Sequence, residues 1–426
     1  MPSSSMSDTK GTQSPASSYL IPKGVHALSS STLDLRPDSD IDRAILSPQP
    51  VTNEKNIWFF WHSGYNSMHP YTQRNIRAWY RRFAKAGWSI RVLNRLPNSP
   101  LNVAQYLDVA DLDTFPRAFI DGTVGGDYAP QHTSDLVRYP LLLKYGGVYA
   151  DVGLMQIGDL DALWNKTVGD PESPFEVLSY NAGDVNVRNL TNYFLCSRKN
   201  NPLFERSHRL FLALWAADGG KTGTEGMHAS PLLKGVPRMM KGELPALVED
   251  DGTIIEPEQV SCMLTDYIIQ GQAMTMVMNL VDKEDGWNGP EYSANHVYAI
   301  DYMEGSQLIN EFTAWNGHRA FELMSLALPR NGEEESADQK QAREIVEACL
   351  SRSFGFKLAH GLIIRVLGET LGSLWRSHPG SDDVVGTYAH FLRHGITYWC
   401  PDSLPERLPF EIIEPIKIGP LLSTDD

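Results

Sequence analysis

The sequence predicts an α/β fold in which a mostly parallel sheet is flanked by helices, and two stretches support this prediction. In residues 56–94 a short apolar run, an amphipathic helical pattern and a second apolar run follow one another. Strand, helix and strand within about forty residues form a βαβ unit, which implies a parallel sheet covered by helices. In residues 133–152 a second helical pattern leads through two glycines into an apolar strand that carries an aspartate.

The elements follow in order along the chain. Residues 1–50 are rich in Ser and Pro with little apolar periodicity, and they predict a flexible leader. The apolar run at 56–61 has the length of a buried strand. Pro70 is well placed in the first turn of a helix that Gly87 can end. Residues 88–94 are expected to form the next strand.

The later elements are helical at first and less regular afterwards. Thr133 or Ser134 is expected to cap the second helix, which should stop at Gly146. Pro140 lies inside this helix and should kink it or break it. Three segments after residue 337 also look helical. The expected organisation is a leader at 1–50, a catalytic domain at 51–330 and a helical C-terminal extension at 331–426 that packs on it.

Composition narrows the class of protein. The chain has 426 residues, of which 42% are hydrophobic and 21% charged, as is usual for a globular enzyme. The net charge of -15 argues against a surface that binds polyanions everywhere. Four scattered cysteines show no metal-ligand spacing, which fits a reducing compartment. No signal peptide or membrane span is expected, so we predict a cytoplasmic protein without a membrane partner.

A family resemblance enters at "TSDLVRYPLLLKYGGVYADV", residues 133–152. This stretch resembles the Ser-Asp-x-x-Arg helix, Tyr-Gly-Gly turn and aspartate-ending strand of capsular-polysaccharide-synthesis and Och1-like glycosyltransferases. "NIWFFWHSG", residues 56–64, resembles their first strand. The resemblance implies a GT-A-like fold, that of nucleotide-diphospho-sugar transferases, with helical C-terminal additions.

Three charged residues of this stretch are site candidates. Asp135 and Arg138 share one helix face, where they either pair with each other or close over a donor nucleotide. Asp151 ends its strand, where open α/β sheets place ligands. Metal-dependent glycosyltransferases of this fold hold Mg²⁺ or Mn²⁺ with two carboxylates, but here Gly153 stands at the second position. A metal site at Asp151 is therefore expected only if the protein is a glycosyltransferase.

The loop after the first strand supplies further candidates for substrate binding. His62, Ser63 and Gly64 follow directly on the apolar run. An isolated histidine more often satisfies a local hydrogen bond than a catalytic role. The position after a strand nevertheless favours contact with a ligand.

A second carboxylate pair lies in "AIDYMEGSQLINEFTAWNG", residues 299–317. Asp301 and Glu304 share one face if this segment is helical, although such spacing is also common at exposed helix starts. The segment resembles the Asp-x-x-Glu element of arginine-containing cyclodipeptide synthases, except that Ile300 replaces a further Asp. The resemblance implies catalytic roles for Asp301, Glu304 and Asp151 in joining arginine to a second amino acid, with both taken from aminoacyl-tRNAs.

A basic zone between residues 74 and 95 contains no acidic residue. Basic groups beside aromatic rings suit a nucleic-acid backbone with an unstacked end. The alternative is the solvated face of one helix and a strand. The tRNA-binding candidates are Arg74, Arg77, Arg81, Arg82 and Arg91.

Three functional hypotheses follow. The main one is a cyclodipeptide synthase of fungal secondary metabolism that makes a diketopiperazine from arginyl-tRNA and a second aminoacyl-tRNA. It needs no cofactor and implies no stable protein partner. The alternative is a glycosyltransferase that uses a UDP- or GDP-sugar with Mn²⁺ or Mg²⁺ and a small-molecule or glycan acceptor. The third is an inactive binding module on the same scaffold.

Overall fold

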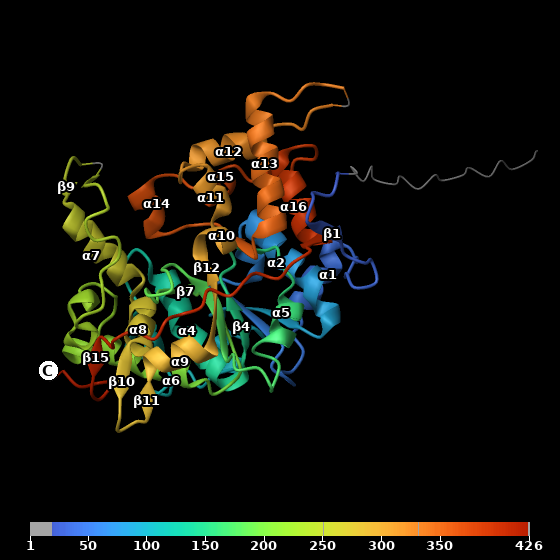
Figure 1. The fold of residues 1–426 in the computed structure, drawn as a ribbon. Coiled ribbons are helices and arrows are strands. Elements are labelled where there is room, and N and C mark those ends of the chain that lie inside the picture. Colours follow the sequence, from blue (N-terminus) through green and yellow to red (C-terminus); the bar gives the residue numbers. More distant parts are fainter. Residues whose placement is uncertain (1–18, 250, 331, 425–426) are drawn as a thin grey trace, which may run out of the picture.

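A six-stranded sheet forms the centre of the computed structural model, which describes residues 19–249, 251–330 and 332–424. Helices flank the sheet on both sides (Figure 1). In spatial order its strands are β12 (Val297–Asp301), β6 (Val177–Asn181), β7 (Leu190–Ser197), β4 (Gly147–Ala150), β2 (Asn56–Phe60) and β3 (Ser89–Leu93).

The direction of the strands decides which ends lie together. β3, β2 and β4 pair in parallel, as do β6 and β12, while β7 is antiparallel to both of its neighbours. The carboxyl ends of all strands of this sheet except β7 therefore meet at one edge. This mixed α/β fold with a mostly parallel sheet is the predicted one.

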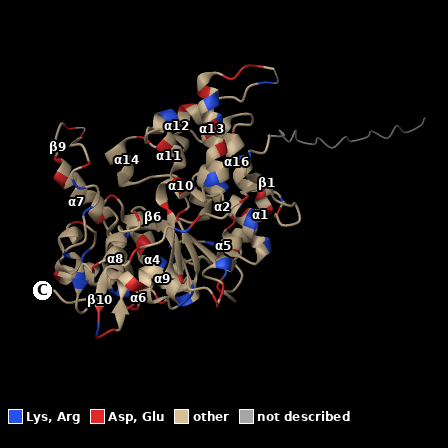
Figure 2. Cartoon of the chain, in the orientation of Figure 1, with Lys and Arg blue, Asp and Glu red and all other residues tan. Residues whose placement is uncertain are grey.

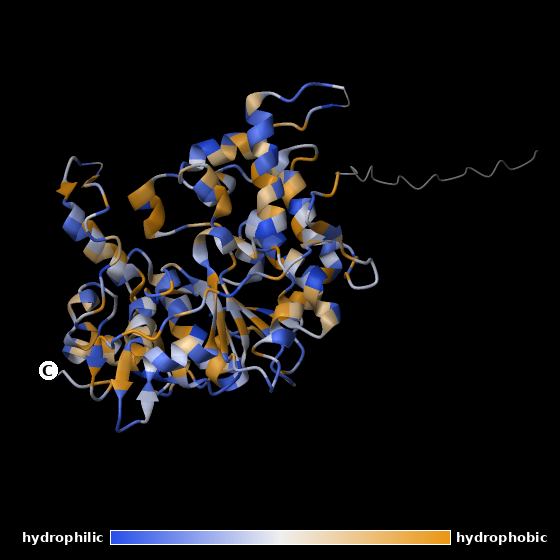
Figure 3. Ribbon diagram, in the orientation of Figure 1, coloured by the Kyte–Doolittle hydropathy of each residue, from blue (hydrophilic) through white to orange (hydrophobic). Residues whose placement is uncertain are grey.

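Two helical layers cover the sheet. The strands are among the most apolar parts of the ribbon (Figure 3), and side chains from both of their faces are buried. The first layer contains α4 (Ala129–Tyr145), α6 (Pro202–Ala216), α8 (Ile269–Met278) and α9 (Gly289–His296). The second contains α1 (Asp38–Leu46), α2 (Pro70–Phe83) and α5 (Leu160–Lys166).

A helical unit packs beyond the carboxyl edge of the sheet (Figure 1). It contains α10 (Tyr302–Ser306), α11 (Leu308–Phe312), α12 (Gly317–Ser325), α13 (Ala337–Arg352), α15 (Leu371–Ser377) and α16 (Tyr388–Tyr398). Ile309 and Leu323 share a buried cluster with Ile345. This unit therefore begins before residue 331, earlier than the boundary expected from the sequence.

The remaining helices and strands lie outside the central sheet and these layers. They are the helices α3 (Arg117–Ile120), α7 (Pro257–Tyr267) and α14 (Leu362–Leu367), and the strands β1 (Val25–Ala27), β5 (Leu154–Gln156), β8 (Leu247–Val248), β9 (Ile254–Ile255), β10 (Leu280–Asp282), β11 (Trp287–Asn288), β13 (Gly355–Lys357), β14 (Trp399–Pro401) and β15 (Lys417–Ile418). β13, β14 and β15 pair with β5, β1 and β10, so the C-terminal extension is not purely helical.

Two expectations need correction. The flexible leader is wrong for residues 19–50, because β1 pairs with β14 and α1 packs against α2. Residues 1–18 lie outside the described residues. The second helix starts at Ala129 instead of Thr133, with Pro130 in its first turn, and it continues across Pro140 as one helix.

Within the described ranges, no helix combines the length and the apolar character that crossing a bilayer requires. The cytoplasmic location stays a prediction.

Candidate active site at the carboxyl edge of the sheet

The candidates from three strands lie at the same edge of the sheet. Asp151 follows β4, residues 62–64 follow β2, and Asp301 is the last residue of β12. Parallel strands bring these positions to the edge where open α/β sheets bind ligands. β4 and β12 are separated by β7 and β6, so Asp151 and Asp301 are about 14 Å apart across the sheet at the usual strand spacing. The two carboxylates are therefore not neighbours.

Asp151 is the outermost carboxylate of a charged network. The Arg138 guanidinium donates to Asp151 Oδ1 at 3.0 Å and lies 3.0 Å from Asp135 Oδ1. The Arg138 and Asp135 side chains are 5% and 7% exposed, whereas that of Asp151 is 26% exposed. Asp135 and Arg138 therefore pair with each other, and the pair also anchors the one carboxylate of the three that reaches solvent.

An amide, a histidine and an aromatic ring complete the surroundings of the buried pair. The Asn192 amide donates to Asp135 Oδ1 at 3.2 Å, and His132 Nδ1 lies 3.4 Å from Asp135 Oδ2. Arg138 also donates to the Asn192 carbonyl at 2.6 Å, and its guanidinium carbon lies 5.0 Å from the centre of the Tyr149 ring. Buried ions are tolerated when they are paired and hydrogen-bonded in this way.

The electrostatics of Arg138 follow from this arrangement. Burial opposes its charge, but the carboxylates of Asp135 and Asp151 outweigh that effect and raise the pKa of Arg138. The guanidinium stays protonated and fixed. Arg138 therefore positions Asp151, and its guanidinium is not free to bind a donor.

Lys357 contacts Asp151 from the other side, and the sequence analysis missed it. Its ammonium lies 3.2 Å from Asp151 Oδ2 and 5.5 Å from the centre of the Tyr193 ring. β13 pairs with β5 and sets Lys357 opposite Leu154, three residues after Asp151. Pairing of residues some 200 positions apart in sequence leaves no local pattern, so no periodicity could have identified this contact.

A histidine lies beside this lysine. His360 Nε2 hydrogen-bonds the Tyr71 hydroxyl at 2.9 Å. Burial lowers the pKa of His360 to about 3, and the charges of Lys357 and Arg376 act in the same direction. His360 is therefore neutral near pH 7.

The residues around Asp151 do not fit a divalent metal ion. One carboxylate oxygen of Asp151 is bonded to Arg138 and the other to Lys357. Gly153 has no side-chain ligand atom, and its backbone carbonyl accepts from the Leu358 N–H at 3.0 Å. The described part of the chain holds no group of three or more His, Cys, Asp or Glu side chains suited to a metal.

The loop after β2 is partly exposed. His62 and Ser63 are exposed, and the Ser63 hydroxyl bonds that of Ser67 at 2.7 Å. Burial and the charge of Arg95 lower the pKa of His62. Gly64 is buried with a φ of 81°, and a Cβ there would lie 2.7 Å from the Leu96 side chain, so the turn requires glycine. His62 and Ser63 remain substrate-contact candidates beside Asp151.

Asp301 and Glu304 form a helix start. Asp301 ends β12 and caps α10, accepting from the Glu304 backbone N–H at 2.7 Å. Glu304 pairs with Arg352 at 2.8 Å, with both side chains 52% exposed. The expected helix thus begins one residue after Asp301, and capping accounts for the spacing of the pair.

The basic zone is not a free cationic surface. Arg77 and Arg81 bond Asp38, and Arg77 also bonds Asp42, both on α1. Arg74 pairs with Asp382. Figure 2 shows acidic residues interspersed with basic ones along the ribbon.

The other two candidates of this zone are buried. Arg82 donates to the Gln156 carbonyl at 2.7 Å, and Arg91 donates to Asn56 at 2.8 Å. Both arginines are hydrogen-bonded inside the fold. The five candidates therefore do not form the exposed cationic surface that tRNA binding would need.

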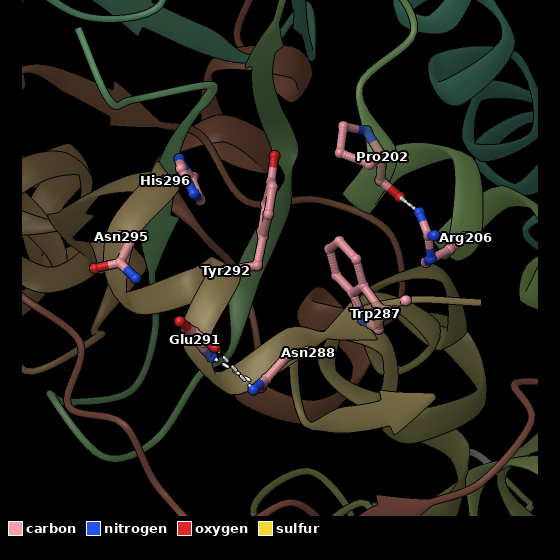
Figure 4. A pocket seen from close by; sticks show the side chains of 9 residues that line it. Pro202, Arg206, Trp287, Asn288, Glu291, Tyr292, Asn295 and His296 are labelled. Carbon is pink, nitrogen blue, oxygen red and sulfur yellow. Dashed lines mark hydrogen bonds between the residues drawn. The ribbon is translucent and has the colours of Figure 1, made fainter. Parts of the chain in front are cut away.

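A cavity of about 360 Å³ lies elsewhere (Figure 4). It is lined by Trp287, Tyr292 and Arg206, among others. α9 leads from it into the start of β12, and Arg206 follows the end of antiparallel β7. The cavity is therefore at the amino edge of the sheet, away from Asp151, and is not the candidate active site.

Comparisons with known proteins identify relatives of this chain. A model of the capsular polysaccharide synthesis protein family matches residues 26–219. O-glycosyltransferase braB of Annulohypoxylon truncatum is 33% identical over 409 residues, which cover 94% of this chain and 93% of that protein. Glycosyltransferase afumC of Aspergillus fumigatus is 33% identical, and the alignment covers 87% of this chain and 93% of afumC. Probable glycosyltransferase FCK3 of Fusarium pseudograminearum is 33% identical, and the alignment covers 85% of this chain and 88% of FCK3.

These relatives overturn the main hypothesis of the sequence analysis. Named glycosyltransferases match this chain over most of its length, so the assignment as an aminoacyl-tRNA-consuming cyclodipeptide synthase is wrong. The aminoacyl-tRNA partners were inferred from that assignment and from the basic zone at residues 74–95. The alternative hypothesis is the one the comparisons favour. With alignments that run nearly end to end, the chain belongs to the family of these glycosyltransferases.

Proposed function

We propose that this protein transfers a sugar from a nucleoside-diphosphate donor to a hydroxyl oxygen of a small-molecule or glycan acceptor. The observation that carries the proposal is the Asp135–Arg138–Asp151 network, which ends in one solvent-accessible carboxylate at the carboxyl edge of the sheet. Its support from similarity is the near full-length match to a protein named O-glycosyltransferase.

The chemistry follows from the charges at this edge. The acceptor oxygen forms a bond to the anomeric carbon, and the bond between that carbon and the diphosphate oxygen breaks. The electron pair of the broken bond stays on the diphosphate, and the hydroxyl proton is released to solvent. Fixed cations near the leaving group lower the barrier, since they face charge that grows in the transition state.

Each part of the edge has a role in this proposal. Asp151 holds the ammonium of Lys357 in place, and the buried Arg138 holds Asp151. The exposed His62 and Ser63, in the loop after the neighbouring strand β2, contact the donor or the acceptor. The residues that would contact the nucleotide base are not assigned, so the test includes both UDP- and GDP-sugars.

The test uses the purified full-length chain with a panel of nucleotide sugars and simple phenol, alcohol and sugar acceptors. Free nucleoside diphosphate is measured by chromatography and glycoside by mass spectrometry. We expect at least one donor to give nucleoside diphosphate and a product heavier by one sugar residue. A panel in which no donor is hydrolysed or transferred contradicts the proposal.

A further inference from the structure

Lys357 fills the space beside Asp151 and Gly153. A Cβ added to Gly153 would lie 3.0 Å from the Leu358 carbonyl and 3.4 Å from the Lys357 ammonium. The backbone of this segment is fixed, because Leu358 N–H donates to the Gly153 carbonyl at 3.0 Å. The space beside Asp151 that a second carboxylate would enter is therefore taken by a cation and a carbonyl.

The ammonium is held in place by its neighbours. Lys357 Nζ contacts Asp151 Oδ2 at 3.2 Å and donates to the Leu358 carbonyl at 3.1 Å. An ammonium has three N–H donors, so these two oxygens leave capacity for a phosphate oxygen. The Lys357 side chain is 14% exposed, compared with 5% for Arg138, and it is therefore the cation of the network that a ligand reaches.

The charge balance points the same way. Asp135 and Asp151 are matched by Arg138 and Lys357, so the four groups carry no net charge. Two carboxylates that are each matched by a fixed protein cation have little net attraction for a divalent ion. A diphosphate oxygen at this edge would bond the ammonium N–H that Asp151 and the Leu358 carbonyl leave free.

We propose that Lys357 neutralises the leaving nucleoside diphosphate in place of a divalent metal ion, so that donor binding and sugar transfer are independent of metal. This inference rests on the proposed function, and it names the group that makes the reaction possible. The ammonium bonds a diphosphate oxygen as the bond to the anomeric carbon breaks. Asp151 positions the ammonium and does not ligate a metal.

The experiment measures binding of UDP, GDP, ADP and dTDP by calorimetry, in EDTA and in Mn²⁺. We expect at least one to bind with an affinity that EDTA changes by less than about twofold. Because a charge-assisted hydrogen bond contributes about 1.5–3 kcal/mol, Lys357→Met should weaken that binding about 10- to 100-fold. Lys357→Arg should recover most of the affinity, since it restores a cation. Circular dichroism of each variant checks that it is folded.

A matched control is Lys340→Met on α13, a lysine that is 64% exposed and should leave nucleotide binding unchanged. Binding that EDTA abolishes and Mn²⁺ restores would overturn the role of Lys357 while leaving the glycosyltransferase proposal intact. Unchanged binding by folded Lys357→Met would also overturn it. Absence of binding by all four nucleotides in both conditions would overturn this inference together with the proposed function.

Discussion

The pairs Asp135–Arg138 and Asp301–Glu304 have the same spacing in sequence but different surroundings. The first pair lies within α4, whereas Asp301 ends β12 and caps α10, which contains Glu304. The first pair is buried and linked through Arg138 to Asp151. The second is exposed, with Asp301 capping α10 and Glu304 bonded to a surface arginine. Three-residue spacing therefore fits both a pair on one helix face, as in α4, and a cap with the residue whose backbone it binds, as at α10.

The largest expected effect comes from breaking the buried pair. Arg138→Met leaves two carboxylates without their shared cation, and removal of one partner from a buried ion pair costs about 3–5 kcal/mol. Urea unfolding measures the change in the free energy of unfolding. The matched variant at the exposed pair is Arg352→Met, which should change stability by less than about 1 kcal/mol. Equal effects at the two positions would contradict the distinction between site and cap.

A smaller effect on stability is expected from lowering the pH, through His360 beside the buried network. The pKa of His360 is lowered to about 3, mainly by burial and further by Lys357 and Arg376, so the folded state binds a proton less readily than the unfolded state. The unfolded histidine takes up its proton as the pH falls below about 6.5, and stability is then lost.

Part of the His360 surface is exposed, so we expect His360 to account for about 1–2 kcal/mol of lost stability between pH 7 and pH 5. His360→Gln keeps a partner for the Tyr71 hydroxyl and has no charge to gain, so its loss over this range should be smaller by that amount. Urea midpoints at the two pH values measure both proteins. Identical pH dependence of the two would show that His360 titrates normally.

The smallest effect is expected at the exposed pair. Asp301→Ala removes the cap of α10 and should cost about 1 kcal/mol, while Asp301→Asn keeps the cap and should cost less. Thermal unfolding compares the two variants. We expect donor turnover to be unchanged in both, and a loss of turnover that exceeds the loss of folded protein would restore Asp301 as a catalytic residue.

Much of the architecture was predictable because it depends on local patterns. The apolar run at 56–61, Pro70 and the following strand gave β2, α2 and β3 almost to the residue. The glycines after α4 placed β4, and they placed Asp151 at the end of that strand. Such features are set by periodicity, fixed φ angles and strand ends, all of which the sequence displays directly.

Two errors of interpretation had one physical cause. The basic zone looked free of acidic partners because those partners, Asp38 and Asp42, lie in the segment taken for a flexible leader. Lys357 was missed for a related reason, since β13 is a three-residue strand whose partner β5 lies far back in the sequence. Charge pairs between distant segments form only in the tertiary structure, so the residues within one short stretch of sequence do not reveal them.

The most direct measurement compares Asp151→Asn and Asp301→Asn in donor turnover with the best nucleotide sugar. Both changes remove one negative charge at the carboxyl edge of the same sheet. We expect Asp151→Asn to lower kcat/KM at least about 100-fold, because it releases the Lys357 ammonium that faces the transition-state charge, and Asp301→Asn to leave kcat/KM unchanged. Full activity of Asp151→Asn, or a greater loss in Asp301→Asn, would contradict the assignment of the active site to the end of β4.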